Sequence, residues 1–210
     1  MRLLAIDTCL AACSAALLEG ERVLAARSEP MERGHQERLA PLVRELAEEA
    51  GIAFATLDRI GVTVGPGSFT GLRVGLAFAK GMGLALQKPV VGVGTLEALA
   101  ATAGRGLVAA AIDARREQVY LQVFRDGEAA SEPEALTGED ALERVRLLGS
   151  GRAVTLAGSG ARLLADGLPG AEVQDLAAAD PLAVARLAWA SEQPARPLYL
   201  RAPDAKLPAA

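Results

Sequence analysis

The stretch that decides the fold is residues 3–21, LLAIDTCLAACSAALLEGE, because a related stretch returns at residues 108–128, VAAAIDARREQVYLQVFRDGE. Each begins as an apolar strand that ends in Ala-Ile-Asp, turns, continues as a second strand and closes on a polar Gly-Glu turn. Thirteen positions separate Asp7 from Gly20, and fourteen separate Asp113 from Gly127. The shared triplet, hairpin length and closing turn predict two related lobes, each of which opens with a β-hairpin.

The remainder of each lobe predicts alternating strands and helices. Apolar residues recur at helical spacing along 35–50, and Gly51 follows as a stop signal. Asp180-Pro181 is a typical N-cap and first-turn pair, and Ser159-Gly160 also opens a helix. We therefore expect a mixed α/β protein with one lobe over 1–104 and a second over 105–210. The other predicted strands are 22–28, 60–64, 89–93, 107–112, 119–124 and 154–157, and the other predicted helices are 70–86 and a short one capped by Thr95.

Composition narrows the classes of protein that this chain could represent. Its 210 residues are 51% hydrophobic and carry a net charge of −4, which argues against a broad nucleic-acid surface. The single histidine, His35, excludes a metal site built on a histidine pair, and Cys9 and Cys13 form neither a disulfide framework nor a zinc pattern. The N-terminal MRLLAIDT reaches an aspartate too early for a signal peptide, and no uncharged apolar run approaches the ~18 residues of a membrane span. We expect a soluble, cytoplasmic protein without a membrane partner.

The glycine-rich segment 65–75, GPGSFTGLRVG, lies between a predicted strand and a predicted helix. It matches neither the P-loop, because no Lys-Ser or Lys-Thr pair follows, nor the dinucleotide fingerprint, because Thr70 stands where the third glycine belongs. The helix N-terminus behind it could still bind an anion. A plain strand-to-helix turn is the other reading of this segment.

The helix that follows this loop has a ridge of small residues. Gly71, Gly75, Ala79 and Gly83 are spaced four apart, and each helical glycine costs up to ~1 kcal/mol relative to alanine. Close packing against another backbone would offset that cost. The ridge could pack on the chain's own sheet, or it could belong to a helical protein–protein interface.

Several segments together resemble one family. They are MRLLAIDT with ACSAAL, GHQERLAPLV, GVTVGPGSFTGLRVGLAFAKGMGLAL, VVGVGTLEALA, AAIDARREQVY and PLYLRAP. The chain resembles the bacterial tRNA threonylcarbamoyladenosine biosynthesis family TsaB, also called YeaZ, over nearly its whole length, although residues 129–180 carry no specific motif. The resemblance implies the actin-like ATPase (sugar kinase/Hsp70/actin) fold with two duplicated lobes.

The resemblance also implies a role and partners. The family supports formation of N6-threonylcarbamoyladenosine at position 37 of tRNAs that read codons beginning with A. It is a non-catalytic partner of the paralogue TsaD, and the ATPase TsaE completes the complex. TsaD holds a metal with a His-x-x-x-His pair, whereas here Leu39 stands four residues after His35. We therefore expect no catalytic or metal-binding residues in this chain, and contact with tRNA only through the complex.

In the family, the two helices of the first lobe form a four-helix bundle, both in the homodimer and with TsaD. Here those helices are 35–50 and 70–86, which makes GPGSFTGLRVG the turn before an interface helix. Phe69 and Arg73 are candidate anchors because aromatic residues and arginine are enriched at hot spots. Core burial of Phe69 and a solvated salt bridge at Arg73 are the alternatives. The full set of expected partner-binding residues is Leu39, Leu42, Phe69, Gly71, Leu72, Arg73, Gly75, Leu76, Ala79, Lys80 and Gly83.

A nucleotide site is the remaining question that the resemblance raises. By the fold, Asp7 and Thr8 match the first phosphate hairpin, Asp113 matches the second, and Gly158 and Gly160 match the adenosine loop. Ala114-Arg115-Arg116 replaces the glycine-rich turn of an active ATPase, which predicts a degenerate site with no required cofactor and at most weak ATP or ADP binding. The alternative function is a nucleotide-binding ATPase or kinase-like enzyme of the same superfamily. The terminal KLPAA, residues 206–210, is expected to be mobile.

Overall fold

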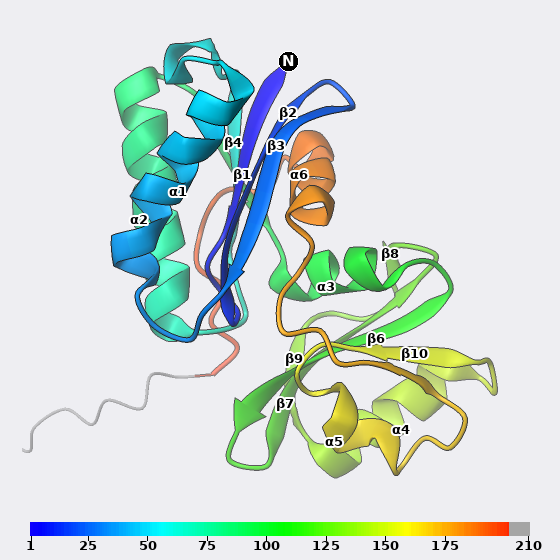
Figure 1. Ribbon diagram of the computed structural model, residues 1–210. Coiled ribbons are helices and arrows are strands. Elements are labelled where there is room, and N and C mark those ends of the chain that lie inside the picture. The colour runs from blue at the N-terminus through cyan, green and yellow to red at the C-terminus, as the bar shows by residue number, and fades with distance from the viewer. Residues whose placement is uncertain (202–210) are drawn as a thin grey trace, which may run out of the picture.

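A computed structural model describes residues 1–201, and the predicted mobile end at 206–210 lies outside these residues. The chain forms two lobes, each built on its own sheet (Figure 1). Helices α1 (His35–Ala50) and α2 (Phe69–Leu86) cover one face of the first sheet, and α6 (Pro181–Ala190) covers the other. Helix α3 (Thr95–Ala103) lies between the lobes and packs on both α6 and the second sheet. The two-lobed α/β prediction is therefore confirmed.

The first sheet has the strand order β3-β2-β1-β4-β5. Strands β1 (Arg2–Asp7), β2 (Ala12–Glu19) and β3 (Arg22–Pro30) form the antiparallel meander. Strands β4 (Arg59–Thr63) and β5 (Val90–Val93) run parallel to β1. A short 3-10 turn, η1 (Phe54–Thr56), precedes β4. Because β1 and β4 are both buried, they read as nearly continuous apolar runs.

The second sheet repeats this plan with the order β11-β10-β6-β7-β8. Strands β6 (Leu107–Arg115) and β7 (Gln118–Arg125) form the second hairpin, and β10 (Val154–Ala157) runs parallel to β6 as β4 does to β1. The duplication predicted from Ala-Ile-Asp is thus a duplication of strand order. The sequence did not predict β8 (Glu128–Ala129), β9 (Glu134–Thr137), α4 (Gly138–Gly149) or β11 (Glu172–Gln174). The helix predicted after Ser159-Gly160 is α5 (Ala161–Ala165), which completes this lobe.

The strands of the first sheet end at Val93 and those of the second begin at Leu107, but the chain crosses back after the second sheet. Helix α6 packs on β1, β2 and β4 of the first sheet. Arg59 fixes its C-terminal end, because one guanidinium nitrogen donates to the carbonyl oxygens of Ala188, Trp189 and Ser191 at 3.3, 3.1 and 2.9 Å. Residues 197–201, PLYLR, have no regular strand structure, although the Leu198 N–H donates to the Val64 carbonyl at 2.8 Å.

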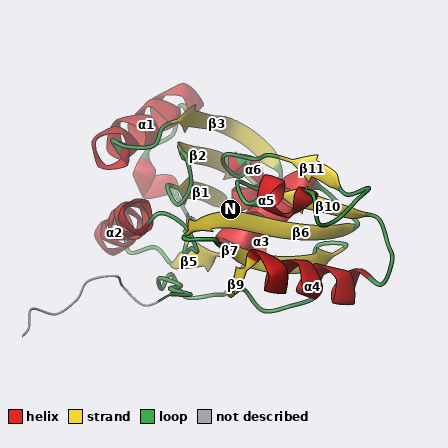
Figure 2. Ribbon diagram, turned by 90° about the horizontal axis from the view of Figure 1, so that it is seen from below, coloured by secondary structure: helices red, strands yellow, loops and turns green. Residues whose placement is uncertain are grey.

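Helix α2 is unusually apolar for the outermost layer of a lobe. Its 18 residues have a mean hydropathy of 1.2, which together with its length would suit a membrane span, although it carries Arg73 and Lys80. One side is buried on the first sheet, yet only 33% of the helix is buried. Both views place α1 and α2 at the outside of the first lobe, with no other labelled element beyond them (Figures 1 and 2). An apolar helix surface therefore faces solvent.

Candidate functional site

The solvent-facing side of α2 carries a stripe that we call the α2 face. Phe69 is 45% exposed and Leu84 is 84% exposed, so two large apolar side chains mark its ends. Between them the side chains are small or basic. Residues spaced three or four apart lie in line on a helix, which makes this one continuous surface. It consists of Phe69, Arg73, Ala77, Lys80, Gly81 and Leu84.

The glycine ridge of α2 faces inward and not toward the α2 face. A Cβ at Gly71 would collide with the carbonyl oxygen of Thr8, and one at Gly75 would lie 2.6 Å from the Thr8 hydroxyl. The Thr8 hydroxyl also donates to the Gly71 carbonyl at 2.7 Å. Ala79 is fully buried, and a Cβ at Gly83 would overlap Val90. The ridge therefore packs on the chain's own first sheet, and these four residues are not available to a partner as predicted.

The four leucines that were expected to bind a partner also lie inside the lobe. Leu39 and Leu42 of α1 and Leu72 and Leu76 of α2 are all buried in one core cluster with the first sheet. Their burial contradicts the expectation that they contact a partner, because helical periodicity identifies an apolar side without saying what covers it. Of the predicted partner-binding residues, Phe69, Arg73 and Lys80 remain exposed.

Phe69 and Arg73 meet a residue that the sequence analysis did not select. The guanidinium carbon of Arg73 lies 3.6 Å from the centroid of the Phe69 ring. The Tyr199 ring lies 5.6 Å from that of Phe69, and its hydroxyl accepts from Arg73 Nε at 3.3 Å. Tyr199 is 43% exposed. The three side chains form one exposed cluster at the N-terminal end of the α2 face, which we call the aromatic cluster.

Gly81, on the other hand, is a helical glycine without an intramolecular reason. A Cβ there would meet no atom within 4 Å among the described residues, in contrast to the other glycines inside α2. Glycine within an exposed helix costs up to ~1 kcal/mol relative to alanine, and packing among the described residues does not explain it at this position.

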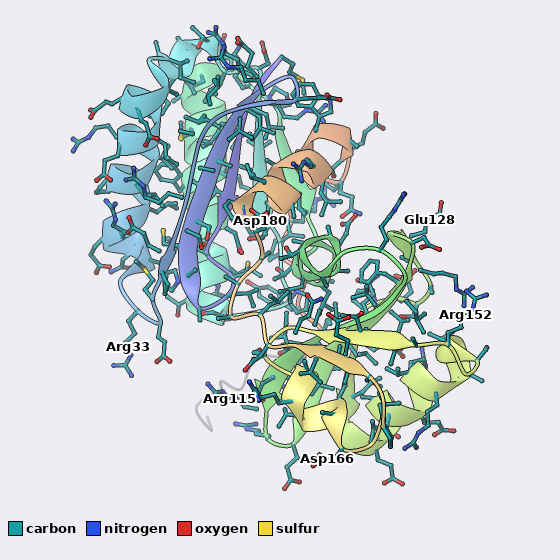
Figure 3. All side chains as sticks on the ribbon, turned by 45° about the vertical axis from the view of Figure 1, so that its right-hand side comes forward. Arg33, Arg115, Glu128, Arg152, Asp166 and Asp180 are labelled. Atoms are coloured by element: carbon teal, nitrogen blue, oxygen red, sulfur yellow. The ribbon has the colours of Figure 1, made fainter. Side chains whose placement is uncertain are left out.

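A cavity of about 610 Å³ separates the two lobes. It lies between the turn of the first hairpin, the turn of the second and the loop before α2. Figure 3 shows Arg33 on the first lobe and Arg115 on the second, both toward the same side of the molecule. Its charged and polar lining residues include Glu32, Arg33, His35, Asp113, Arg115, Ser159, Asp175 and Arg201.

The predicted nucleotide residues only partly reach this cavity. Asp113 lines it, whereas Asp7 and Thr8 are buried beneath the first hairpin and do not. Gly158 and Gly160 do not line it either, because they pack on β6. A Cβ at Gly158 would collide with the Ala111 carbonyl oxygen, and one at Gly160 would lie 3.1 Å from backbone carbons of Ala111 and Ile112. Strand contact thus accounts for the glycine at 158 independently of any adenosine.

Several backbone N–H groups at the two hairpin turns already donate within the chain. Cys9 N–H donates to Asp7 Oδ1 at 2.8 Å, and Ala11 N–H donates to the Ala177 carbonyl at 3.1 Å. In the second hairpin, Arg115 N–H donates to Asp113 Oδ1 at 2.7 Å, and Gly160 N–H donates to Ala111. The residues present therefore do not fit a phosphate-binding hairpin pair.

The turn of the second hairpin adds a steric reason. Arg115, Arg116 and Glu117 all have φ between 55° and 62°, the left-handed region that favours glycine. The Arg115 side chain is largely exposed and lies 3.6 Å from the Asp113 carboxylate. Long side chains thus occupy a turn whose backbone conformation favours glycine.

Asp7 is the most unusual ionisable group of the first hairpin. Its Oδ1 accepts from Thr63 Oγ1 at 2.6 Å, while Oδ2 has no hydrogen-bond partner among the described residues. Burial raises the pKa of Asp7, opposed by the bonds from Thr63 and Cys9 and by nearby His35. Burial and the Asp7 charge likewise raise the pKa of the Cys9 thiol to about 12, so this cysteine is not an activated nucleophile.

Asp7→Asn is expected to become more stable relative to the wild type as pH rises. The folded state favours neutral Asp7, so it binds more protons than the unfolded chain does between the two pKa values. The wild type therefore loses stability as pH rises from about 4 to the pKa of Asp7 in the folded state. The Asp7→Asn variant has no carboxyl group at this position and does not show that loss. Urea unfolding of both proteins from pH 4.5 to 8.5 measures the difference, and a constant difference across this range would contradict the assignment.

Comparisons with known proteins agree with this fold and these motifs. The family model described as "TsaD: tRNA N6-adenosine threonylcarbamoyltransferase" matches residues 27–179. The chain is 38% identical over 132 residues to the tRNA threonylcarbamoyladenosine biosynthesis protein TsaB of Escherichia coli, and that match covers 61% of this chain. It spans just over half the length of the curated TsaB proteins it matches, 57% for E. coli and 56% for Bacillus subtilis.

Solved structures extend the likeness over nearly the whole chain. YeaZ from Pseudomonas aeruginosa is 36% identical with a TM-score of 0.81, and the match covers 95% of this chain and 99% of that one. Component A of the Acidaminococcus fermentans (R)-2-hydroxyglutaryl-CoA dehydratase is 14% identical with a TM-score of 0.54, covering 90% and 98%, which shows the fold alone.

Proposed function

The chain belongs to the family described by the TsaD model and, within it, to the TsaB/YeaZ group, and on that premise we propose that it is a non-catalytic scaffold subunit in tRNA threonylcarbamoyladenosine formation. In this proposal it binds a TsaD-like catalytic paralogue through the α2 face and supports its activity. A TsaE-like ATPase completes the assembly, and tRNA is recognised by the complex.

The observation that carries the proposal is the α2 face, on which Gly81 is exposed. Ala77 and Gly81 are small residues between the two ends, Phe69 and Leu84, and Arg73 and Lys80 are the basic side chains of the same surface. Small residues let a partner helix approach closely, and large ones at the edges can insert beside it. Exposed Phe and Leu side chains on one helix also carry an apolar surface that is worth about 25 cal/mol per Å² when it is covered.

A second copy of the chain is the other partner that this surface suits. A helix face that packs on its own two-fold copy is self-complementary, and the small residues Ala77 and Gly81 between two apolar ends would let two such helices approach closely. We propose that the homodimer and the TsaD-like complex use the same α2 face, so that the two assemblies exclude each other.

We propose that the chain alone catalyses no reaction, and the residues around the interlobe cavity support this. ATP hydrolysis is the alternative function. It is disfavoured because N–H groups of both hairpin turns are already hydrogen-bonded within the chain, and because Gly158 and Gly160 pack on β6. Leu39 also stands where a second metal-binding histidine would be needed. Any ATP or ADP binding would then be weak and not required.

Reconstitution tests the proposal. The chain is mixed with a TsaD-like subunit and a TsaE-like ATPase from one organism, with tRNA, threonylcarbamoyl-adenylate and ATP. We expect threonylcarbamoyl transfer that depends on this chain, and only background transfer and ATP hydrolysis by the chain alone. Transfer that is unaffected by omitting the chain, or hydrolysis by the chain alone well above background, would refute it.

A further inference from the structure

The segment 198–201 touches three separate parts of the molecule within four residues. Leu198 N–H donates to the Val64 carbonyl at the end of β4, which ties the segment to the first sheet. Tyr199 joins the aromatic cluster on α2. One guanidinium nitrogen of Arg201 donates to the Ala114 carbonyl at 3.1 Å and to Gln118 Oε1 at 3.2 Å, both in the second hairpin. The segment thus bridges the two lobes.

One end of this bridge, Arg201, lines the interlobe cavity, and Tyr199 near the other end contacts Phe69, which also lines it. Ala114 and Arg115 of the second hairpin are among the lining residues as well. The aromatic cluster is therefore at once the end of the α2 face and the rim of the cavity. A change in the position of Tyr199 can be passed to the second hairpin through two peptide units.

We infer that residues 198–201 form a strap that couples partner binding on the α2 face to the position of the second lobe. The inference rests on the proposed function, since it takes the TsaD-like subunit as the partner. Tyr199 is then an additional partner-binding residue. The partner covers Tyr199, holds the strap in place, and through Arg201 holds the second hairpin against the cavity.

The aromatic cluster suits such a contact physically. Phe69 and Tyr199 are two of the seven Phe, Tyr and Trp residues of the chain, and both remain nearly half exposed. Arg73 lies between them and is held by the ring face of one and the hydroxyl of the other. Aromatic residues and arginine held in one geometry are the residue types that dominate binding energies. Because coupling is reciprocal, fixing the second hairpin must in turn favour the partner-binding arrangement.

The first arm of the test measures affinity for the TsaD-like subunit by calorimetry. Tyr199→Ala is expected to bind about tenfold more weakly or worse, because it removes an anchor from the cluster. Tyr199→Phe keeps the ring and should stay within about threefold of the wild type. Arg186→Ala, an exposed arginine on α6 distant from the strap, is the control. Equal affinities for all four proteins would overturn Tyr199 as a contact.

The second arm measures amide hydrogen exchange of residues 114–118, free and in the complex. Exchange in the wild type is expected to slow on partner binding, although the partner covers the other lobe. Arg201→Ala should still bind the partner and lose this slowing. Unchanged exchange in the wild type, or identical slowing in Arg201→Ala, would overturn the strap. Failure of the wild type to bind at all would refute the proposed function, a result distinct from either of these.

Discussion

Gly71→Ala is expected to lower the free energy of unfolding by about 3 kcal/mol, the upper end of the usual cost of overpacking. The added methyl group would point at the main-chain carbonyl of Thr8, which cannot rotate away as a side chain could. Relief would require α2 to move off the first hairpin, which breaks the hydrogen bond from Thr8 to Gly71. For a chain of this size, the loss corresponds to a fall in Tm of about 6–12 °C.

Gly81→Ala on the same helix is the matched control for this prediction. No described atom lies within 4 Å of its added methyl group, so the higher helix propensity of alanine should raise stability by up to ~1 kcal/mol. Calorimetric melting of both variants with the wild type measures the contrast. Equal Tm values for the two variants would contradict the inward orientation of the ridge.

Leu84→Glu is expected to weaken binding of the TsaD-like subunit by a hundredfold or more, roughly the cost of burying one unpaired charge in a helical interface. Its side chain is 84% exposed in the isolated chain, so the free protein should keep its stability within about 0.5 kcal/mol. Titration calorimetry measures the affinity, and chemical unfolding measures the stability. Gly81→Ala should weaken the same complex while stabilising the free chain.

Leu147→Glu is the matched control, because Leu147 is 71% exposed on α4 of the second lobe. It should bind the partner like the wild type. Leu76→Glu would not serve this purpose, since Leu76 is 6% exposed in the core and a charge there should unfold the lobe. An equal loss of affinity for Leu84→Glu and Leu147→Glu would contradict a binding site on α2.

The parts of the fold that could be predicted from the sequence are those in which local pattern and tertiary role coincide. The two Ala-Ile-Asp hairpins predicted the duplicated sheets. The apolar stripe from Leu39 to Ala47, followed by Gly51, predicted the observed bounds of α1. Within residues 129–180, the sequence pattern predicted only two short elements, the strand 154–157 and the helix after Ser159-Gly160. There, β9 and β11 are four and three residues long and only partly buried, so their pairing depends on contacts with neighbouring strands that no local pattern records.

The candidate site was predictable in place but not in orientation. The sequence pointed to α2, and Phe69 and Arg73 are exposed there. Periodicity could not tell which small residues face the sheet, so Gly71 and Gly81 could be distinguished only once Thr8 was seen beside the first. Tyr199 was out of reach for another reason, because it contacts α2 from 126 residues away in sequence.

Light scattering after size exclusion tests the central claim most directly, using the wild type and Leu84→Glu, each alone and mixed with a TsaD-like subunit from the same organism. The account predicts a stable complex of the wild type with that subunit, and separate folded components when Leu84→Glu is used. A wild-type mixture that elutes as separate proteins would contradict the claim that this chain is a TsaD-binding subunit, and a complex that survives Leu84→Glu intact would contradict binding through the α2 face.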